Sequence, residues 1–179
     1  MKKNLSILFL VIFSIINTAC STQAKTYQIS SLNNAKMMQL HKKINVQLSP
    51  SSINDTSVSS RLSSISMPNN DRIDEYIKNA FNGELRYAKV YSLNKDAVVL
   101  TLELQDVELY TRFGNASWNF KIKISSNNNE SFTLRTQYPF ESLHSSEFDG
   151  YPAASAFKPV VQELILDIIY DKEFINLLK

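Results

Sequence analysis

The stretch AVVLTLELQDVELY, residues 97–110, decides the fold because its apolar side chains recur at every second position. One face carries Val98, Leu100, Leu102 and Leu104, and the other carries Val99, Thr101, Glu103 and Gln105. Side chains alternate between the two faces of a strand, so this pattern predicts a half-buried β-strand. Asp106 interrupts the alternation, and we expect a β-bulge there.

Two further strands follow in the same style. WNFKIKIS, residues 118–125, alternates aromatic or branched residues with Asn and Lys, and FTLRTQYPF, residues 132–140, alternates similarly. The turn-forming stretches FGNAS, residues 113–117, and the Asn tract 127–129 separate the three strands. This spacing predicts antiparallel hairpins with one solvated face.

A strand and a helix are expected before this meander. KINVQLSP, residues 43–50, alternates around Val46 and predicts the first strand. NNDRIDEYIKNAFNG, residues 69–83, places Ile73, Ile77, Ala80 and Phe81 on one helical face. Asn70 is the expected N-cap and Gly83 the expected left-handed stop, followed by a short strand near residues 85–91.

The end of the chain predicts a long apolar helix around residues 153–170 and a short one in DKEFINLLK, residues 171–179. Pro159 either kinks the long helix or marks its start. The fold class expected is α+β, with a mainly antiparallel sheet of about four to five strands and two helices on one face, in the order β-α-β-β-β-α.

The first residues have the layout of a secretory signal. Lys2 and Lys3 precede an apolar run over residues 5–16, which is too short to span a membrane. We expect residues 1–19 to be a signal peptide, residues 20–42 a flexible tether that begins at Cys20, and residues 43–179 a single α+β domain.

Cys20 is the only cysteine in the chain and follows Ala19 directly. Ala followed by Cys resembles the processing site of bacterial lipoproteins, which implies cleavage between Ala19 and Cys20 and acylation of Cys20. Asn17 stands where such sites usually carry Leu. An ordinary secretory cut after Ala19 or Ala24, giving a soluble periplasmic or secreted protein, therefore stays open as the alternative.

Composition excludes several classes of function. The chain has 19 Lys and Arg and 17 Asp and Glu, so loss of Lys2 and Lys3 leaves 17 of each. That balance gives no electrostatic reason to expect a nucleic-acid partner. With His41 and His144 as the only histidines and three isolated glycines, no metal-ligand, nucleophile or phosphate-loop motif can be assembled. We expect no catalytic residue, no metal, no cofactor and no enzymatic activity.

One region combines aromatic and ionisable residues and is a candidate contact loop. Its residues are Tyr138, Phe140, His144, Glu147, Phe148 and Tyr151. Such a set could contact a peptide or glycan, although a solvated connection collects the same residues for its turns.

The chain resembles the YajG-like and transport-auxiliary small outer-membrane lipoproteins. The features are TAC at residues 18–20, VQLSP at 46–50, VVLTLELQDVEL at 98–109 and SAFKPVVQELILDIIYDKEFINLL at 155–178. The resemblance implies a non-enzymatic protein, anchored to the outer membrane by lipid and facing the periplasm, and it supplies no catalytic residues.

We therefore expect an accessory factor that binds an envelope protein through its sheet edge or terminal helix. The alternative is a carrier of a lipid or other apolar ligand, held between Trp118, Phe120 and the helix face at residues 157–169. A secreted hydrolase would need a nucleophile and base clustered around His41 or His144.

Overall fold

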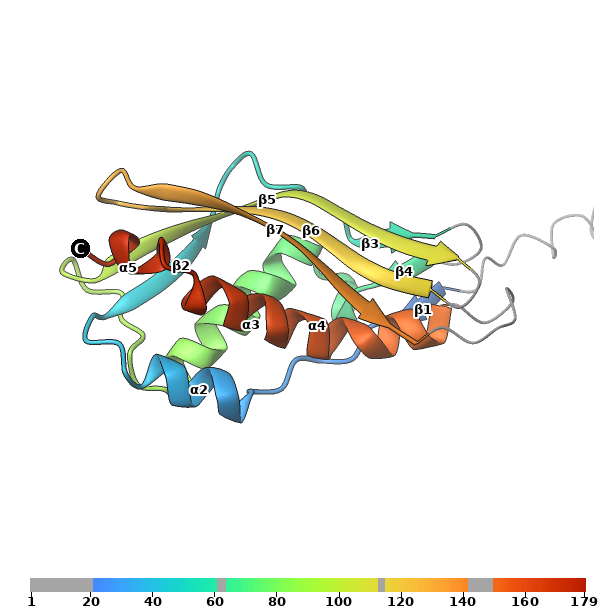
Figure 1. The fold of residues 1–179 in the computed structure, drawn as a ribbon, viewed down its shortest axis with the longest axis horizontal. Helices are drawn as coiled ribbons and strands as arrows, with labels where there is room; N and C mark the ends of the chain where they lie inside the picture. Colours follow the sequence, from blue (N-terminus) through green and yellow to red (C-terminus); the bar gives the residue numbers. More distant parts are fainter. Residues whose placement is uncertain (1–20, 61–63, 113–114, 142–149) are drawn as a thin grey trace, which may run out of the picture.

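The computed structural model describes residues 21–60, 64–112, 115–141 and 150–179. Its main sheet has four strands in the order β2-β5-β6-β7 (Figure 1). The bounds of these strands are β2 Ile44–Leu48, β5 Val98–Arg112, β6 Asn115–Ser126 and β7 Ser131–Phe140. β5, β6 and β7 are antiparallel neighbours, whereas β2 pairs with β5 in parallel.

The predicted bulge is confirmed between β5 and β6. Leu104 lies opposite Ile122 and Asp106 lies opposite Lys121, so Gln105 is the extra residue. The shift allows Leu104 and Leu109 to be buried on the same face although they are an odd number of residues apart. Without it, the second half of β5 would turn its apolar residues outward.

Two long helices, α3 (Ile73–Tyr87) and α4 (Gly150–Tyr170), cover one face of the main sheet (Figure 1). The predicted α+β class with helices packed on a sheet is confirmed. Pro159 lies inside α4, which is already helical from Gly150, so it does not mark the helix start. The short terminal helix is α5, Phe174–Leu177.

The predicted ends of α3 are wrong. Its N-cap is Arg72, and Asn70 instead ends a 3-10 turn, η1 (Pro68–Asn70). Gly83 lies within the helix, because burial of Leu85 and the hydrogen bonds accepted by Glu84 outweigh the roughly 1 kcal/mol that an internal Gly costs.

The helix ends instead in a Schellman motif that extends over residues 85–90. Val90 N–H donates to Leu85 O at 2.9 Å and Lys89 N–H donates to Arg86 O at 3.0 Å, with Lys89 left-handed at φ 60. Residues 85–87 belong to this helix, so the short strand expected near residues 85–91 is wrong there. Within that stretch, strand pairing is limited to an isolated bridge between Tyr91 and Ile44.

A second, small sheet has the order β1-β4-β3. Its strands are β1 Ser21–Gln23, β4 Ser64–Ser66 and β3 Ser57–Ser59, so residues 51–66, which are rich in Ser, contribute two of them. After β1 the chain continues into α2 (Ser31–Met37), which packs beside α3 and α4.

The prediction of a flexible tether over residues 20–42 is wrong for residues 21–37, which are packed. Ala24, Asn33 and Met37 are buried, and β1 pairs in parallel with β4. Residues 21–37 are therefore part of the folded domain. The signal peptide at residues 1–19 and Cys20 lie outside the described residues.

Candidate functional site

The edge of the main sheet at β2 is closed by side-chain and backbone hydrogen bonds. Asn82, a buried residue of α3, accepts from Val46 N–H at 2.9 Å and donates to Val46 O at 2.8 Å, as a neighbouring strand would. Ile44 N–H donates to Val90 O at 2.9 Å, and Ser92 N–H donates to Ile44 O at 3.1 Å. Few backbone groups of β2 are left for another strand.

The opposite edge, at β7, is open within the described ranges, where only β6 pairs with it. Antiparallel partners alternate between pairs that exchange hydrogen bonds and pairs that do not. Ser126 and Glu130 form a hydrogen-bonded pair, because Ser126 N–H donates to Glu130 O at 3.0 Å. The next pair along the ladder, Ser125 and Ser131, is therefore one that does not exchange hydrogen bonds. The exchanging residues of β7 are thus even-numbered, and odd-numbered residues direct their N–H and C=O groups outward. Pro139, which has no N–H, fits this alternation.

The outward-directed positions of β7 are also exposed through their side chains. They are Ser131, Thr133, Arg135, Gln137 and Pro139. This edge is ten residues long and contains no acidic residue. Long unpaired edges are ready templates for another strand, so β7 is the candidate functional site.

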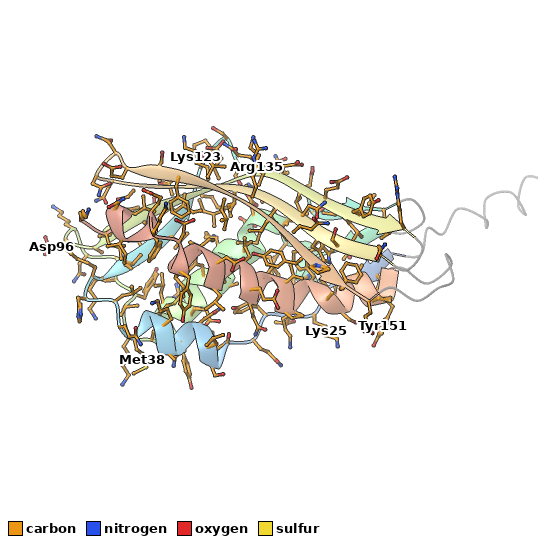
Figure 2. The ribbon with its side chains drawn as sticks, in the orientation of Figure 1. Lys25, Met38, Asp96, Lys123, Arg135 and Tyr151 are labelled. Carbon is orange, nitrogen blue, oxygen red and sulfur yellow. The ribbon has the colours of Figure 1, made fainter. Side chains whose placement is uncertain are left out.

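Arg135 gives β7 itself one positive charge, whereas the lysines of the neighbouring strand lie opposite acids. On the sheet face away from the helices, Lys123 lies opposite Glu103 and Lys121 opposite Asp106 in the β5–β6 ladder. On the β7 side, Lys121 lies opposite Arg135, and no acid is present in β7 to balance it. Figure 2 shows Lys123 and Arg135 together on this face.

A shallow groove of about 580 Å³ lies where β7 ends. Tyr110, Ser117 and Pro139 face one another across β5, β6 and β7 and line it, together with Asn115, Ala116, Gln137, Phe140 and Glu141. Gln137 Nε2 donates to Ser117 Oγ at 3.1 Å. The groove therefore continues the exposed surface of β7 toward the end of the sheet.

Of the predicted contact loop, the structure describes Tyr138, Phe140 and Tyr151. Tyr138 is buried in β7, where its hydroxyl donates to Asp167 Oδ2 at 2.6 Å. Phe140 is half-buried beside the groove, and Tyr151 is exposed on α4. The remaining members, His144, Glu147 and Phe148, lie outside the described residues. Burial, and then the bond to Asp167, raises the pKa of Tyr138.

A buried carboxylate fastens the N-terminal segment to α3. Glu84 Oε1 accepts from Tyr27 OH at 2.5 Å, Ser30 N–H at 2.7 Å and Asn33 Nδ2 at 3.4 Å. Asn33 Nδ2 also donates to Gln162 O at 3.0 Å, which links α2 to α4. Burial, followed by the bond to Glu84, raises the pKa of Tyr27. This cluster accounts for the packed position of residues 24–37.

Neither Asn82 nor Glu84 was identified from the sequence. Their partners lie 36 and up to 57 residues away, so a helical pattern around them carries no sign of those contacts. The sequence shows only that Asn82 and Glu84 are polar and stand next to the apolar face of the helix, which does not reveal their partners. The free β7 edge was expected only in general terms, as the edge of an antiparallel sheet.

The described ranges also bear on metal binding and on membrane insertion. Those ranges contain no group of three or more His, Cys, Asp and Glu residues placed to hold a metal ion. No described helix has both the length and the apolar character needed to cross a membrane. His41 is exposed, and His144 lies outside the described residues.

No protein-family model and no curated protein matches the sequence. Among solved structures, the chain is similar to protein XCC0632 from Xanthomonas campestris, described with the family model DUF330. The two share 10% identity over 81% of this chain and 88% of the other, with a TM-score of 0.48. A likeness at this level assigns no function or site residue, and the resemblance to YajG-like lipoproteins stays a prediction.

Proposed function

We propose that this chain is a lipid-anchored, non-enzymatic protein of the cell envelope that binds another envelope protein along the β7 edge. It is placed at the outer membrane, facing the periplasm, with its anchor at Cys20. The observation that carries the proposal is the contrast between the two edges of the main sheet. One is closed by Asn82 and residues 90–92, whereas the other is open over ten residues.

The binding mode that fits this edge is the addition of one extended segment of the partner. Main-chain groups of Ser131, Thr133, Arg135 and Gln137 would provide hydrogen bonds, and alternate side chains would provide specificity. Because Arg135 faces Lys121 and β7 has no acid, the partner's segment is expected to carry Asp or Glu.

The alternative, a carrier of an apolar ligand, is less well supported. In the space between sheet and α4, the rings of Trp118 and Phe157 pack with centroids 4.8 Å apart, and Phe120 lies 6.4 Å from Phe157. Trp118 Nε1 also donates to Ala153 O at 3.1 Å. These contacts fill the space in which a ligand would lie. Lipid released from the denatured protein, beyond its covalent acyl chains and detectable by mass spectrometry, would instead favour the carrier.

The anchor is tested by replacing Cys20 with Ala and fractionating the cells. We expect the wild-type chain in the membrane fraction and the Cys20→Ala chain in the soluble fraction, because several acyl chains hold a protein on a bilayer. Mass spectrometry of the wild-type N-terminal peptide should show acylated Cys20. A variant that stays with the membranes would contradict the anchor.

The binding edge is tested by photo-crosslinking in intact cells. A photoreactive residue at Thr133 should form one discrete adduct with an envelope protein. The matched control is Asn79, which is also exposed but lies on α3, away from β7. Adducts from both positions, or from neither, would contradict a partner at β7.

A further inference from the structure

The anchor point leaves no slack between the lipid and the folded domain. Ser21, the residue after Cys20, already pairs with Ser64 in the small sheet. Ala24 N–H then donates to Ser66 O at 2.9 Å, and the Ala24 side chain is buried. Consecutive Cα atoms are only about 3.8 Å apart, so an acylated Cys20 holds Ser21 close to the bilayer surface.

Ser21 lies at one end of an elongated molecule. That end, the anchor end, contains β1, the end of β5, the start of β6, the end of β7 and the start of α4 (Figure 1). The opposite end contains α5 and the turn with Asp96 (Figure 2). β5 runs between the two ends with 15 residues, a length of roughly 45–50 Å.

The anchor end has the side chains that suit a headgroup layer. Tyr151 is 66% exposed on the first turn of α4, and Phe140 is half-buried beside the groove. Arg112 lies over the ring of Tyr110 at 5.4 Å, and Lys25 is exposed. Aromatic rings with a polar tip, and basic side chains with an apolar stem, favour the boundary between lipid and water.

We propose that the anchor end lies against the phospholipid headgroups, so that the strands of the main sheet stand upright and the β7 edge extends into the periplasm. This inference rests on the proposed lipid anchor. Its first ground is the absence of slack at Ser21, and its second is the chemistry of Tyr151, Arg112 and Lys25. Glu141 is the acidic side chain at the groove. In this orientation the β7 edge is held at a fixed angle to the membrane, so a partner approaches it from the periplasm.

The test uses the processed, lipidated protein in vesicles of phosphatidylethanolamine and phosphatidylglycerol. Because the chain has one cysteine and the anchor occupies its sulfur, an introduced cysteine is the only free thiol. The variants Tyr151→Cys and Asp96→Cys, both at exposed positions, each carry the same fluorophore. A lipid with a quencher on its headgroup is then added to the vesicles.

We expect the fluorophore at residue 151 to lose most of its emission, whereas the one at residue 96 keeps it. Equal quenching at both positions, or stronger quenching at residue 96, would overturn the orientation while leaving the anchor intact. Mass spectrometry of the same samples separates the two claims. A chain without acyl groups on Cys20 would overturn both.

Discussion

At the scale of single residues, Glu84 determines where the N-terminal segment lies. One carboxylate oxygen accepts hydrogen bonds from Tyr27, Ser30 and Asn33, which come from the segment between β1 and the first turn of α2. Donors that converge on one buried acceptor would lose their partner if the segment moved away, and an unmade buried hydrogen bond is costly. The contact therefore holds a segment that composition alone would leave flexible.

Replacing Glu84 with Ala should lower the free energy of unfolding by about 2–4 kcal/mol, because buried donors lose their acceptor. Chemical denaturation measures the loss, and hydrogen exchange should show faster exchange at the backbone N–H of Ser30. Glu84→Gln keeps an acceptor oxygen and should restore part of the stability. Equal stability of Glu84→Ala and wild type would refute this role.

The alkaline limit of stability follows from three tyrosines, of which Tyr76 and Tyr138 are buried and Tyr27 is half-buried. Burial raises the pKa of Tyr27, Tyr76 and Tyr138 above their ordinary value near 10.0. The folded state then keeps protons that the unfolded state loses, so stability is complete below pH 10 and falls as the pH rises further. Each tyrosine contributes a slope of about 1.4 kcal/mol per pH unit.

The Tyr138→Phe variant tests this pH dependence. It loses the bond to Asp167 and should be about 1 kcal/mol less stable at pH 7. Above pH 10 its unfolding free energy should fall about one third less steeply than that of the wild type, because two titrating tyrosines remain of three. Denaturation curves at pH 7, 10 and 11 measure both effects. Parallel pH profiles would contradict the account.

Sequence reasoning reached some of these residues and missed others. Trp118 and Phe120 were assigned to one face by alternation, and both are buried. Tyr138 was included in the contact loop because that region combines aromatic and ionisable residues, whereas the same alternation puts it on the buried face of β7. Glu84 could not be recognised, because its role depends on a segment brought near only by folding.

At the scale of elements, Asn82 protects the β2 edge of the sheet. Its amide bonds both backbone groups of Val46, and both partners are buried. A β-strand at a sheet edge otherwise offers such groups to any passing strand. The side chain of a helix thus takes the place of a fifth strand.

Replacing Asn82 with Ala should cost about 2–4 kcal/mol of unfolding free energy, because it leaves a buried N–H and C=O without partners. Asn79→Ala, one turn earlier on the exposed face of α3, should change stability by less than about 0.5 kcal/mol. Chemical denaturation of both variants measures the difference. Equal effects would show that the β2 edge does not depend on this amide.

The elements most accessible to prediction were those with long regular patterns. Alternation over residues 98–140 predicted three strands, and the break at Asp106 predicted the bulge. The end of α3 was missed because Gly83 suggested a stop, whereas the motif that ends the helix uses Lys89 in a left-handed conformation. The parallel pairing of β2 with β5 also leaves no mark in their alternation.

At the scale of the whole molecule, the N-terminal segment behaves as part of the domain. Low hydrophobicity suggested a tether, yet Ala24 and Met37 supply enough apolar contact, and Glu84 enough hydrogen bonding, to hold it in place. Because these contacts join residues far apart in the sequence, composition could not reveal them. The consequence is a domain held close to its proposed anchor.

Inserting about twelve Gly and Ser residues between Cys20 and Ser21 should give the anchor roughly 20 Å of flexible reach. The protein should stay with the vesicles, while quenching of the fluorophore at residue 151 should weaken. Unchanged quenching would show that the anchor end binds lipid by itself, so that the short connection between Cys20 and Ser21 would not set the orientation. The fluorophore at residue 96 serves as the control in both forms.

The central claim, that a partner adds a strand to β7, is tested most directly by proline at Arg135. Arg135→Pro removes an outward-directed N–H, whereas Arg135→Ala removes the side chain and keeps that N–H. We measure the crosslinked adduct from Thr133 in cells that express each variant at equal level. The account predicts that the adduct disappears with Arg135→Pro and persists, at reduced yield, with Arg135→Ala; an adduct of equal yield in both would contradict it.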